Sequence, residues 1–306
     1  MMSFIVRRLW WIVVVLLLVA LITFLLAFAV PADPARAIVG PRADATIITA
    51  VRQRLGLNDP LPVQFVRYLW NLLHGDLGYS WVQNKPVSTL ILERLPATLE
   101  LAAAGLLVEL AVGLPTGLLS AARKDGIFDR LNFLIMMVLV ATPPFVLGTL
   151  FLFFLAYQAA LFPLGGMGTP LHLVLPALTL GLPGAAWYSR IMRSSVLEVL
   201  RRDYVRTARA KGLRRQAILL HHVTRNALGP VFTMMGMDLA YFLGGVVLVE
   251  TVFNWPGIGQ QAYQAVQTVD LPLMMGTVIV ASLAILVLNL LVDIGRSFLD
   301  PRVALA

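Results

Sequence analysis

Residues that could carry out catalytic chemistry are few and scattered in this chain. Its four histidines are His74, His172 and the adjacent pair His221 and His222, and none of them has a metal-ligand spacing or lies in an HExxH motif. The chain has no cysteine, no GxSxG motif and no GxxxxGK[ST] loop to hold ATP phosphates. The sequence therefore predicts a protein that is not an enzyme, with no catalytic residue, no metal site and no cofactor of its own.

The composition is that of a membrane protein. Of the 306 residues, 59% are hydrophobic and only 13% are charged, and apolar runs of about 20 residues can cross a bilayer as helices. The runs predict an all-α fold with six transmembrane helices, at about 9–30, 97–121, 132–160, 172–190, 230–250 and 273–293. The first run exceeds the roughly 7–15 apolar residues of a signal peptide, which favours a retained helix.

Most of the positive charge lies in one segment. The formal net charge is +8, and residues 190–229 contain ten Lys or Arg residues against Glu198 and Asp203. In the six-helix topology this segment shares one side with both termini, whereas the loops 161–171 and 250–272 on the other side contain no Lys or Arg. Because cytoplasmic loops carry the excess of Lys and Arg, both termini and the basic segment are predicted to be cytoplasmic.

The acidic residues Glu109 and Asp238 fall deep inside predicted spans. An ionised group is costly in a bilayer, so such residues usually face a helix-bundle interior or a cavity. They could form a structural contact between helices, line a translocation path, or relay protons in a gradient-driven transporter. Neither has a Lys, Arg or His partner deep in a span, which favours the interior contact.

Three adjacent spans are interrupted by Pro and Gly. Proline removes a backbone donor and kinks a helix, and in a membrane the freed backbone groups need a neighbouring helix or a water-lined cavity. The interruptions could reflect ordinary packing or, as their clustering favours, a bundle that surrounds a path. They are Pro143-Pro144, then Pro176, Gly181, Pro183 and Gly184, and finally Gly244-Gly245.

The long segment after the first span alternates apolar and charged residues. Helical spacings such as Val51/Leu55 and Phe65/Leu69/Leu72 predict short amphipathic helices on the outer surface. The predicted division is a first transmembrane helix (1–30), an external amphipathic region (31–93) and a core of five helices (94–296). This core includes a cytoplasmic loop at 191–229 and an external loop at 250–272.

A predicted helix inside the basic segment has two distinct faces. Val205, Ala208 and Gly212 form a narrow face of small side chains at helical spacing. Small side chains allow a partner surface to approach closely, which predicts a docking element for a cytoplasmic protein. The alternative is that the basic residues only hold anionic lipid head groups. Nucleic acid is not an expected partner, because no recognisable binding fold accompanies the charge. The cationic stripe beside the small face consists of Arg202, Arg206 and Arg209.

Around these residues the sequence resembles a known family. "DYVRTARAKGL" (203–213), followed by "HHVTRNALGP", is similar to the cytoplasmic coupling loop of binding-protein-dependent ABC importer permeases of the dipeptide, oligopeptide and nickel branch. The stretches "LGLNDPLPVQFVRYL", "HGDLGYSW" and "VVLVETVFNWPGIGQ" extend the resemblance over almost the whole chain. The general family pattern begins with Glu where this chain has Arg206, so a contact specific to that Glu is not carried over.

The resemblance implies a type I importer fold in the bacterial cytoplasmic (inner) membrane. The five-helix core would pair with a second, similar permease above two ATPase subunits that use ATP and Mg²⁺. An external solute-binding protein would deliver the substrate. Di- or oligopeptides are the expected substrate class, with nickel chelates or glutathione as the alternative. A gradient-driven secondary transporter is a less favoured interpretation.

The resemblance also implies two contact sites. Coupling to the ATPases would involve six residues of the basic helix: Tyr204, Val205, Arg206, Ala208, Arg209 and Gly212. The external loop would face the binding protein at the outer mouth, through Phe253, Trp255, Pro256 and Gly257.

Overall fold

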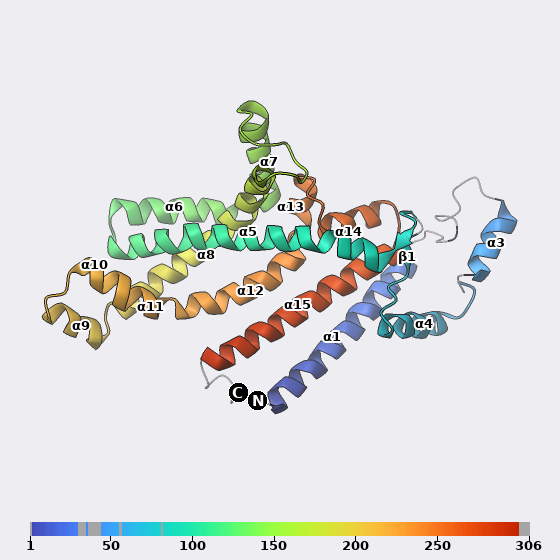
Figure 1. Ribbon diagram of the computed structural model, residues 1–306, viewed down its shortest axis with the longest axis horizontal. Helices are drawn as coiled ribbons and strands as arrows, with labels where there is room; N and C mark the ends of the chain where they lie inside the picture. The colour runs from blue at the N-terminus through green and yellow to red at the C-terminus, as the bar shows by residue number, and fades with distance from the viewer. Residues whose placement is uncertain (1, 30–34, 36–43, 55–56, 81, 300–306) are drawn as a thin grey trace.

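The computed structural model describes residues 2–29, 35, 44–54, 57–80 and 82–299, and these are mostly helical (Figure 1). The first half of the chain contains α1 (Met2–Ala29), α3 (Ala45–Arg54), α4 (Leu61–Leu73), strands β1 (Tyr79–Ser80) and β2 (Lys85–Pro86), α5 (Val87–Ala122), α6 (Ile127–Ala141), α7 (Pro144–Phe151) and the π-helix η1 (Leu152–Gln158). The second half contains α8 (Pro170–Val199), α9 (Asp203–Ala210), α10 (Arg215–Ala217), the π-helix η2 (Ile218–Val223), α11 (Thr224–Ala227), α12 (Gly229–Gly245), α13 (Val247–Val252), α14 (Ile258–Gln267) and α15 (Leu271–Leu299).

Four of the described helices are long and apolar enough to cross a membrane: α1, α5, α8 and α15. A fifth span results if α6 and the helix that follows it are one broken span. The remaining predicted span coincides with α12, whose 17 residues lie at the lower limit for crossing a bilayer. Helix length and composition therefore establish four or five of the six predicted spans.

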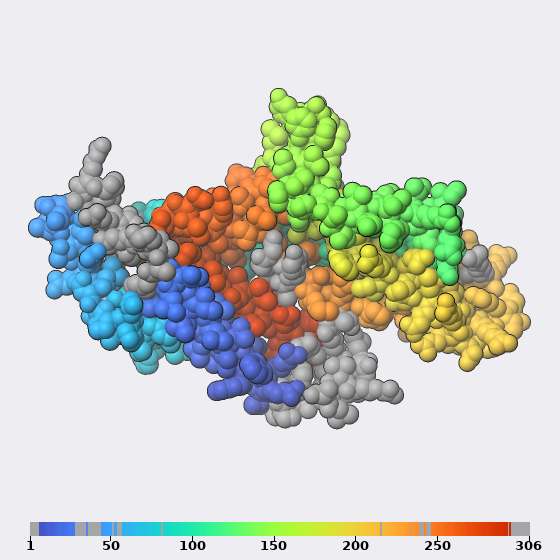
Figure 2. All heavy atoms as spheres, turned by 180° about the vertical axis from the view of Figure 1, so that it is seen from behind, coloured from blue at the N-terminus to red at the C-terminus, as the bar shows by residue number. Residues whose placement is uncertain are grey.

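The predicted break at Pro143-Pro144 is present as a bend of 103° between α6 and the segment from α7 to η1. Because the Thr142 backbone is extended ahead of the two prolines, α6 ends there and α7 restarts in a new direction. Figures 1 and 2 show this segment projecting from the body of the molecule. Its exposed side chains include Phe153 and Tyr157, so its surroundings in a membrane must be apolar.

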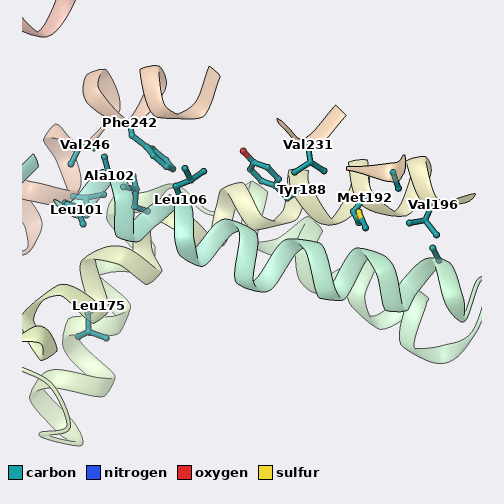
Figure 3. Close-up of a cluster of buried hydrophobic side chains, with 14 of the residues drawn as sticks. Leu101, Ala102, Leu106, Leu175, Tyr188, Met192, Val196, Val231, Phe242 and Val246 are labelled. Atoms are coloured by element: carbon teal, nitrogen blue, oxygen red, sulfur yellow. The ribbon is translucent and has the colours of Figure 1, made fainter. Parts of the chain in front are cut away.

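The long helices α5 and α8 form the centre of the fold and pack closely along their length. Both run without interruption, although each contains two internal prolines. Their contact uses small residues: a Cβ added at Gly113 of α5 would lie 2.6 Å from the carbonyl oxygen of Ala185, and one at Gly181 of α8 would lie 2.5 Å from that of Gly105. The glycines of α8 thus serve close helix packing, the plainer of the two predicted explanations. Figure 3 shows buried side chains of α5, α8 and α12 gathered along this contact.

A second layer is formed by α12, α15 and α1, with α15 in contact with both of the others. In Figure 1 these helices slant side by side below α5. Phe24 of α1 packs on Phe65 and Tyr68 of α4, with ring centroids 5.2 and 6.0 Å away. The predicted amphipathic helices are therefore present, and α4 lays its apolar face on α1. Of the predicted Val51/Leu55 pair, Leu55 lies outside the described residues and Val51 belongs to α3.

The region that is predicted to be external is joined to the core by the β1–β2 hairpin, in which Ser80 pairs with Lys85. The Ser80 hydroxyl donates a buried hydrogen bond to the carboxylate of Asp270, whose other oxygen accepts the Leu273 backbone N–H at the start of α15 (3.4 Å). The predicted boundary at residue 93 falls inside the continuous helix α5, which begins at Val87. Residues on both sides of this boundary therefore belong to one helix.

Candidate functional site

The short helix α9 lies in the basic segment. It begins at Asp203, an acidic residue in the first turn that complements the positive end of the helix dipole. At its other end the backbone N–H of Gly212 donates to the Arg209 carbonyl oxygen (2.9 Å), and that of Leu213 donates to Ala208 (3.3 Å). This Schellman ending needs a residue in the left-handed region, and Gly212 has a φ of +75°. Gly212 therefore ends the helix and offers no side chain for docking.

The small face of α9 packs against the chain itself. Val205 is fully buried and Ala208 is 7% exposed, in a cluster that also contains Ile218 and Val223 of η2. The prediction that Val205 and Ala208 present a docking face to another protein is therefore wrong. Their small size instead lets α9 lie close to η2.

The side of α9 opposite Val205 and Ala208 is exposed. We call this side, whose residues point away from Val205 and Ala208 at helical spacing, the outer face of α9. Tyr204 lies at one edge and is 43% exposed. Arg206 and Arg209 have no ion-pair partner among the described residues, whereas Arg202 pairs with Glu198 of α8 (2.6 Å). The outer face consists of Asp203, Arg206, Thr207 and Ala210, all exposed.

In the external loop, the aromatic residues lie inside the molecule. Phe253 and Trp255 are each 1% exposed, and the Trp255 indole donates a hydrogen bond to the Ala97 carbonyl oxygen of α5 (2.8 Å). The prediction that these side chains face a binding protein is therefore wrong, because they are buried within this chain. The position of the loop at an outer mouth stays a prediction. Pro256 is half-buried and Gly257 is buried. The exposed residues of the next helix, α14, include Tyr263 and Val266.

Glu250, which the sequence reasoning passed over, organises this loop. It is fully buried, and its carboxylate accepts hydrogen bonds from the Thr98 hydroxyl (2.7 Å) and the Gln260 backbone N–H (2.9 Å). Thr98 in turn accepts the Ile258 backbone N–H (2.8 Å). Two polar side chains thus satisfy the free amides at the start of α14. Gly257 precedes that helix, and a methyl group there would overlap the Glu250 carboxylate.

The two predicted intramembrane acids lie at the contact of α5, α8 and α12. Glu109 is 2% exposed, and its carboxyl group lies against Gly184, where a methyl group would overlap it. One Glu109 oxygen has no hydrogen-bond partner among the described residues. Asp238 accepts a hydrogen bond from the Tyr188 hydroxyl (2.6 Å). These positions support an interior role for Glu109, while a role of Asp238 at a path stays a prediction.

A second buried polar network joins α5, α6 and α8 at their end near α9. The Arg193 guanidinium donates two hydrogen bonds of 2.7 Å to the two oxygens of Asp129, which is 6% exposed. One turn along α6, the Asn132 amide donates to Ser120 and Ser189, both at 3.0 Å. Bidentate pairs of this kind fix geometry, so the network holds α6 onto α8 and α5.

Two of the four histidines make local side-chain contacts. The His74 ring lies 2.8 Å from the Trp70 carbonyl oxygen through Nδ1, and the His172 Nδ1 accepts the Thr169 backbone N–H (3.1 Å) at the start of α8. Within the described part of the chain, no three His, Asp or Glu side chains come together as metal ligands could.

Comparison with known proteins places the chain in a family. A family model described as "binding-protein-dependent transport system inner membrane component" matches residues 113–305, and the model of its N-terminal region matches residues 1–102. The chain belongs to this family of permeases. Among curated relatives, the permease is 40% identical over 303 residues to a glutathione transport system permease protein of Pectobacterium atrosepticum, covering 99% of both chains. It is 39% identical to a probable peptide ABC transporter permease of Sinorhizobium fredii, covering 98% of both.

The permease also shares its fold with a solved structure. An inward-facing form of the MetNI methionine ABC transporter matches with a TM-score of 0.55 and 19% identity, over 71% of this chain and 97% of that one. At this identity the likeness shows the fold alone. The permease is therefore an inner-membrane protein with the fold of an ABC importer membrane subunit.

The two motifs that carried the family resemblance have different structural roles in the permease. The "YVRTARAKG" segment (204–212) provides two buried anchors, Val205 and Ala208, and a helix end at Gly212, and its residues Arg206, Thr207 and Ala210 belong to the outer face of α9. The "ETVFNWPGIG" motif is a buried capping network. A glutamate placed eight residues before "IG", the start of a helix, was the local signal that could have identified Glu250 as its cap.

Proposed function

We propose that the permease is one of two membrane subunits of an ABC importer for di- or oligopeptides. In this proposal it has six spans, with α12 as the fifth and the broken α6–η1 segment as the third, and both termini are cytoplasmic. The observation that carries the proposal is the outer face of α9, an exposed surface with Arg206, unpaired among the described residues, on a helix of the basic segment that is anchored to a membrane bundle. The names of the curated relatives, which refer to glutathione and peptide transport, support the substrate class.

The coupling step follows from how α9 is attached. An ATPase subunit binds the outer face, and ATP-driven movement of the two ATPases displaces α9. Val205 and Ala208 fix α9 to η2, and η2 continues through α11 into the transmembrane helix α12. Closely packed contacts transmit such a displacement because interiors are poorly compressible. ATP and Mg²⁺ are used by the ATPases, and the permease contributes the moving helices.

On the external side, we assign contact with the binding protein to α14. Its buried side includes Ile258 and Ala265, and its opposite side exposes Tyr263 and Val266. Exposed aromatic and apolar side chains are typical of interface centres. Trp255 acts behind this surface, by holding the loop on α5 through its bond to Ala97, and Phe253 packs beside Gly148 of α7.

Photo-cross-linking from α14 tests that assignment. Because the chain has no cysteine, Tyr263→Cys or Val266→Cys supplies its only thiol, to which a photoreactive maleimide is attached. Both variants are expected to capture the binding protein at least about fivefold more than Ala265→Cys, which is buried on the same helix. Equal capture from all three positions would show that α14 is not part of the interface. Capture of the ATPases would contradict the proposed topology.

Uptake by the complete transporter in proteoliposomes tests the function itself. We expect ATP-dependent entry of a labelled dipeptide that persists when a protonophore collapses the proton gradient. Uptake that needs the gradient and proceeds without ATP would instead show a secondary transporter. Glutathione is the second candidate substrate because relatives are named for it, and a nickel chelate is the third. Competition among the three for the binding protein identifies the substrate.

A further inference from the structure

We propose that a pocket between α6 and α8 binds an anionic phospholipid from the cytoplasmic leaflet of the membrane. The pocket lies between Arg130, Phe133 and Met137 of α6 and Ala186, Arg190 and Arg193 of α8, and we call it the α6–α8 pocket. Its volume is about 560 Å³, within the range of roughly 300–1,000 Å³ that is usual for ligand sites. Its sidedness rests on the proposed topology. Figure 2 shows α6 and α8 side by side on the surface of the molecule.

The charge of the pocket fits a phosphate group. Arg130 and Arg190 are exposed and have no carboxylate partner among the described residues. Arg190 lies over the Trp187 ring, with its guanidinium carbon 5.3 Å from the ring centroid. The third arginine, Arg193, is held by the buried Asp129 and forms part of the wall. Two guanidinium groups thus remain free to bind phosphate oxygens, as basic pockets between membrane helices do with anionic head groups.

The acidic residues at the mouth do not cancel this charge. Asp129 is neutralised by Arg193, and its carboxylate also accepts the Asp125 backbone N–H (2.9 Å). The Asp125 side chain is itself near Lys124, with 3.8 Å between Nζ and the carboxylate. The unpaired charge in the pocket is therefore that of Arg130 and Arg190.

The order of residues along the pocket matches the layers of a phospholipid. Arg130, Phe133 and Met137 lie three and four residues apart on α6, so they line one face over a rise of about 10 Å. On the antiparallel helix α8, the sequence from Arg190 to Ala186 runs in the same direction, from charged to apolar. Phe133 and Met137 are more than half exposed, and an acyl chain would cover them. A soluble phosphate would use only the arginines.

The lipid would join two elements that the Asp129–Arg193 pair already connects. Arg130 belongs to α6 and Arg190 to α8, and α8 leads directly into the segment that carries α9. A bound head group would thus brace the permease beside its coupling helix.

The test measures lipid retained by the complete transporter. It is purified in mild detergent with its partner subunits, after incubation with vesicles of 70% phosphatidylcholine and 30% phosphatidylglycerol, and bound lipid is quantified by mass spectrometry. The double variant Arg130→Gln with Arg190→Gln is expected to retain about tenfold less phosphatidylglycerol than wild type. The matched control, Arg123→Gln with Arg201→Gln, removes two exposed positive charges after the ends of α5 and α8, outside the pocket, and is expected to retain the wild-type amount.

Two further variants separate lipid from other occupants. Phe133→Ser with Met137→Ser keeps both arginines but removes the apolar lining. It is expected to lower phosphatidylglycerol retention severalfold. The concentration of inorganic phosphate that displaces the remaining phosphatidylglycerol is expected to stay unchanged, because phosphate would use only the arginines. Equal retention by the pocket variants and the Arg123/Arg201 control would overturn the proposal. So would efficient cross-linking of Met137→Cys to the second permease, because a protein would then cover the pocket. Each outcome is independent of which substrate is transported.

Discussion

Replacing Thr207 with tryptophan is expected to lower the amount of ATPase that co-purifies with the permease by about tenfold, which corresponds to about 1.4 kcal/mol of binding free energy. Thr207 lies on the outer face of α9, away from the buried Val205 and Ala208. A large side chain inserted into a closely packed contact costs about 1–3 kcal/mol. Because Thr207 is exposed in the permease alone, the substitution should leave the fold of this chain unchanged. The measurement is the ratio of ATPase to permease after affinity purification, together with substrate-stimulated ATP hydrolysis.

The matched control for this variant is Gln216→Trp. Gln216 lies in α10 of the same basic segment and is also exposed, but it is outside α9. We expect the control to keep the wild-type ratio of ATPase to permease. If Thr207→Trp also kept that ratio, the outer face of α9 could not be the ATPase contact. A variant at Val205 would not answer the question, because it would disturb the packing of α9 on η2.

The sequence was sufficient for the positions of most helices, because long apolar runs and an amphipathic repeat leave few alternatives. It predicted the apolar face of α4 and the break before Pro144, both of which depend on local chemistry. It could not decide which surface the small residues of α9 approach. Spacing shows that Val205 and Ala208 share a face, but the partner of that face, η2, depends on how the segment folds back on itself.

The errors at the external loop have a similar cause. Trp255 is buried because its indole reaches Ala97, which is 158 residues away in sequence, and no local pattern reports such a contact. The pair of Asp129 and Arg193 is 64 residues apart and was missed for the same reason. By contrast, Glu250 lies only ten residues before the Gln260 amide that it binds, so its capping role could have been inferred from sequence.

The second large effect is expected at Glu250. Replacing Glu250 with alanine removes the acceptor for the Thr98 hydroxyl and the Gln260 backbone N–H, both in the fully buried interior. An unsatisfied buried donor costs about 1–3 kcal/mol, so the two together should lower the free energy of unfolding by about 3 kcal/mol. Thermal unfolding of the purified transporter measures the loss. Glu250→Gln keeps the volume and one accepting oxygen, so its loss should be about half as large.

Glu100→Ala is the matched control, because Glu100 is an exposed glutamate on α5 close in sequence to Thr98, and surface substitutions usually change stability by less than about 0.5 kcal/mol. Equal unfolding temperatures for Glu250→Ala and Glu100→Ala would contradict the capping role. Thr98→Val gives a second, independent check. Since Thr98 and Glu250 serve the same helix start, the double variant should lose less stability than the sum of the single variants. Additive losses would mean that the two side chains act separately, and α14 would then owe its position to the Trp255–Ala97 bond and apolar packing.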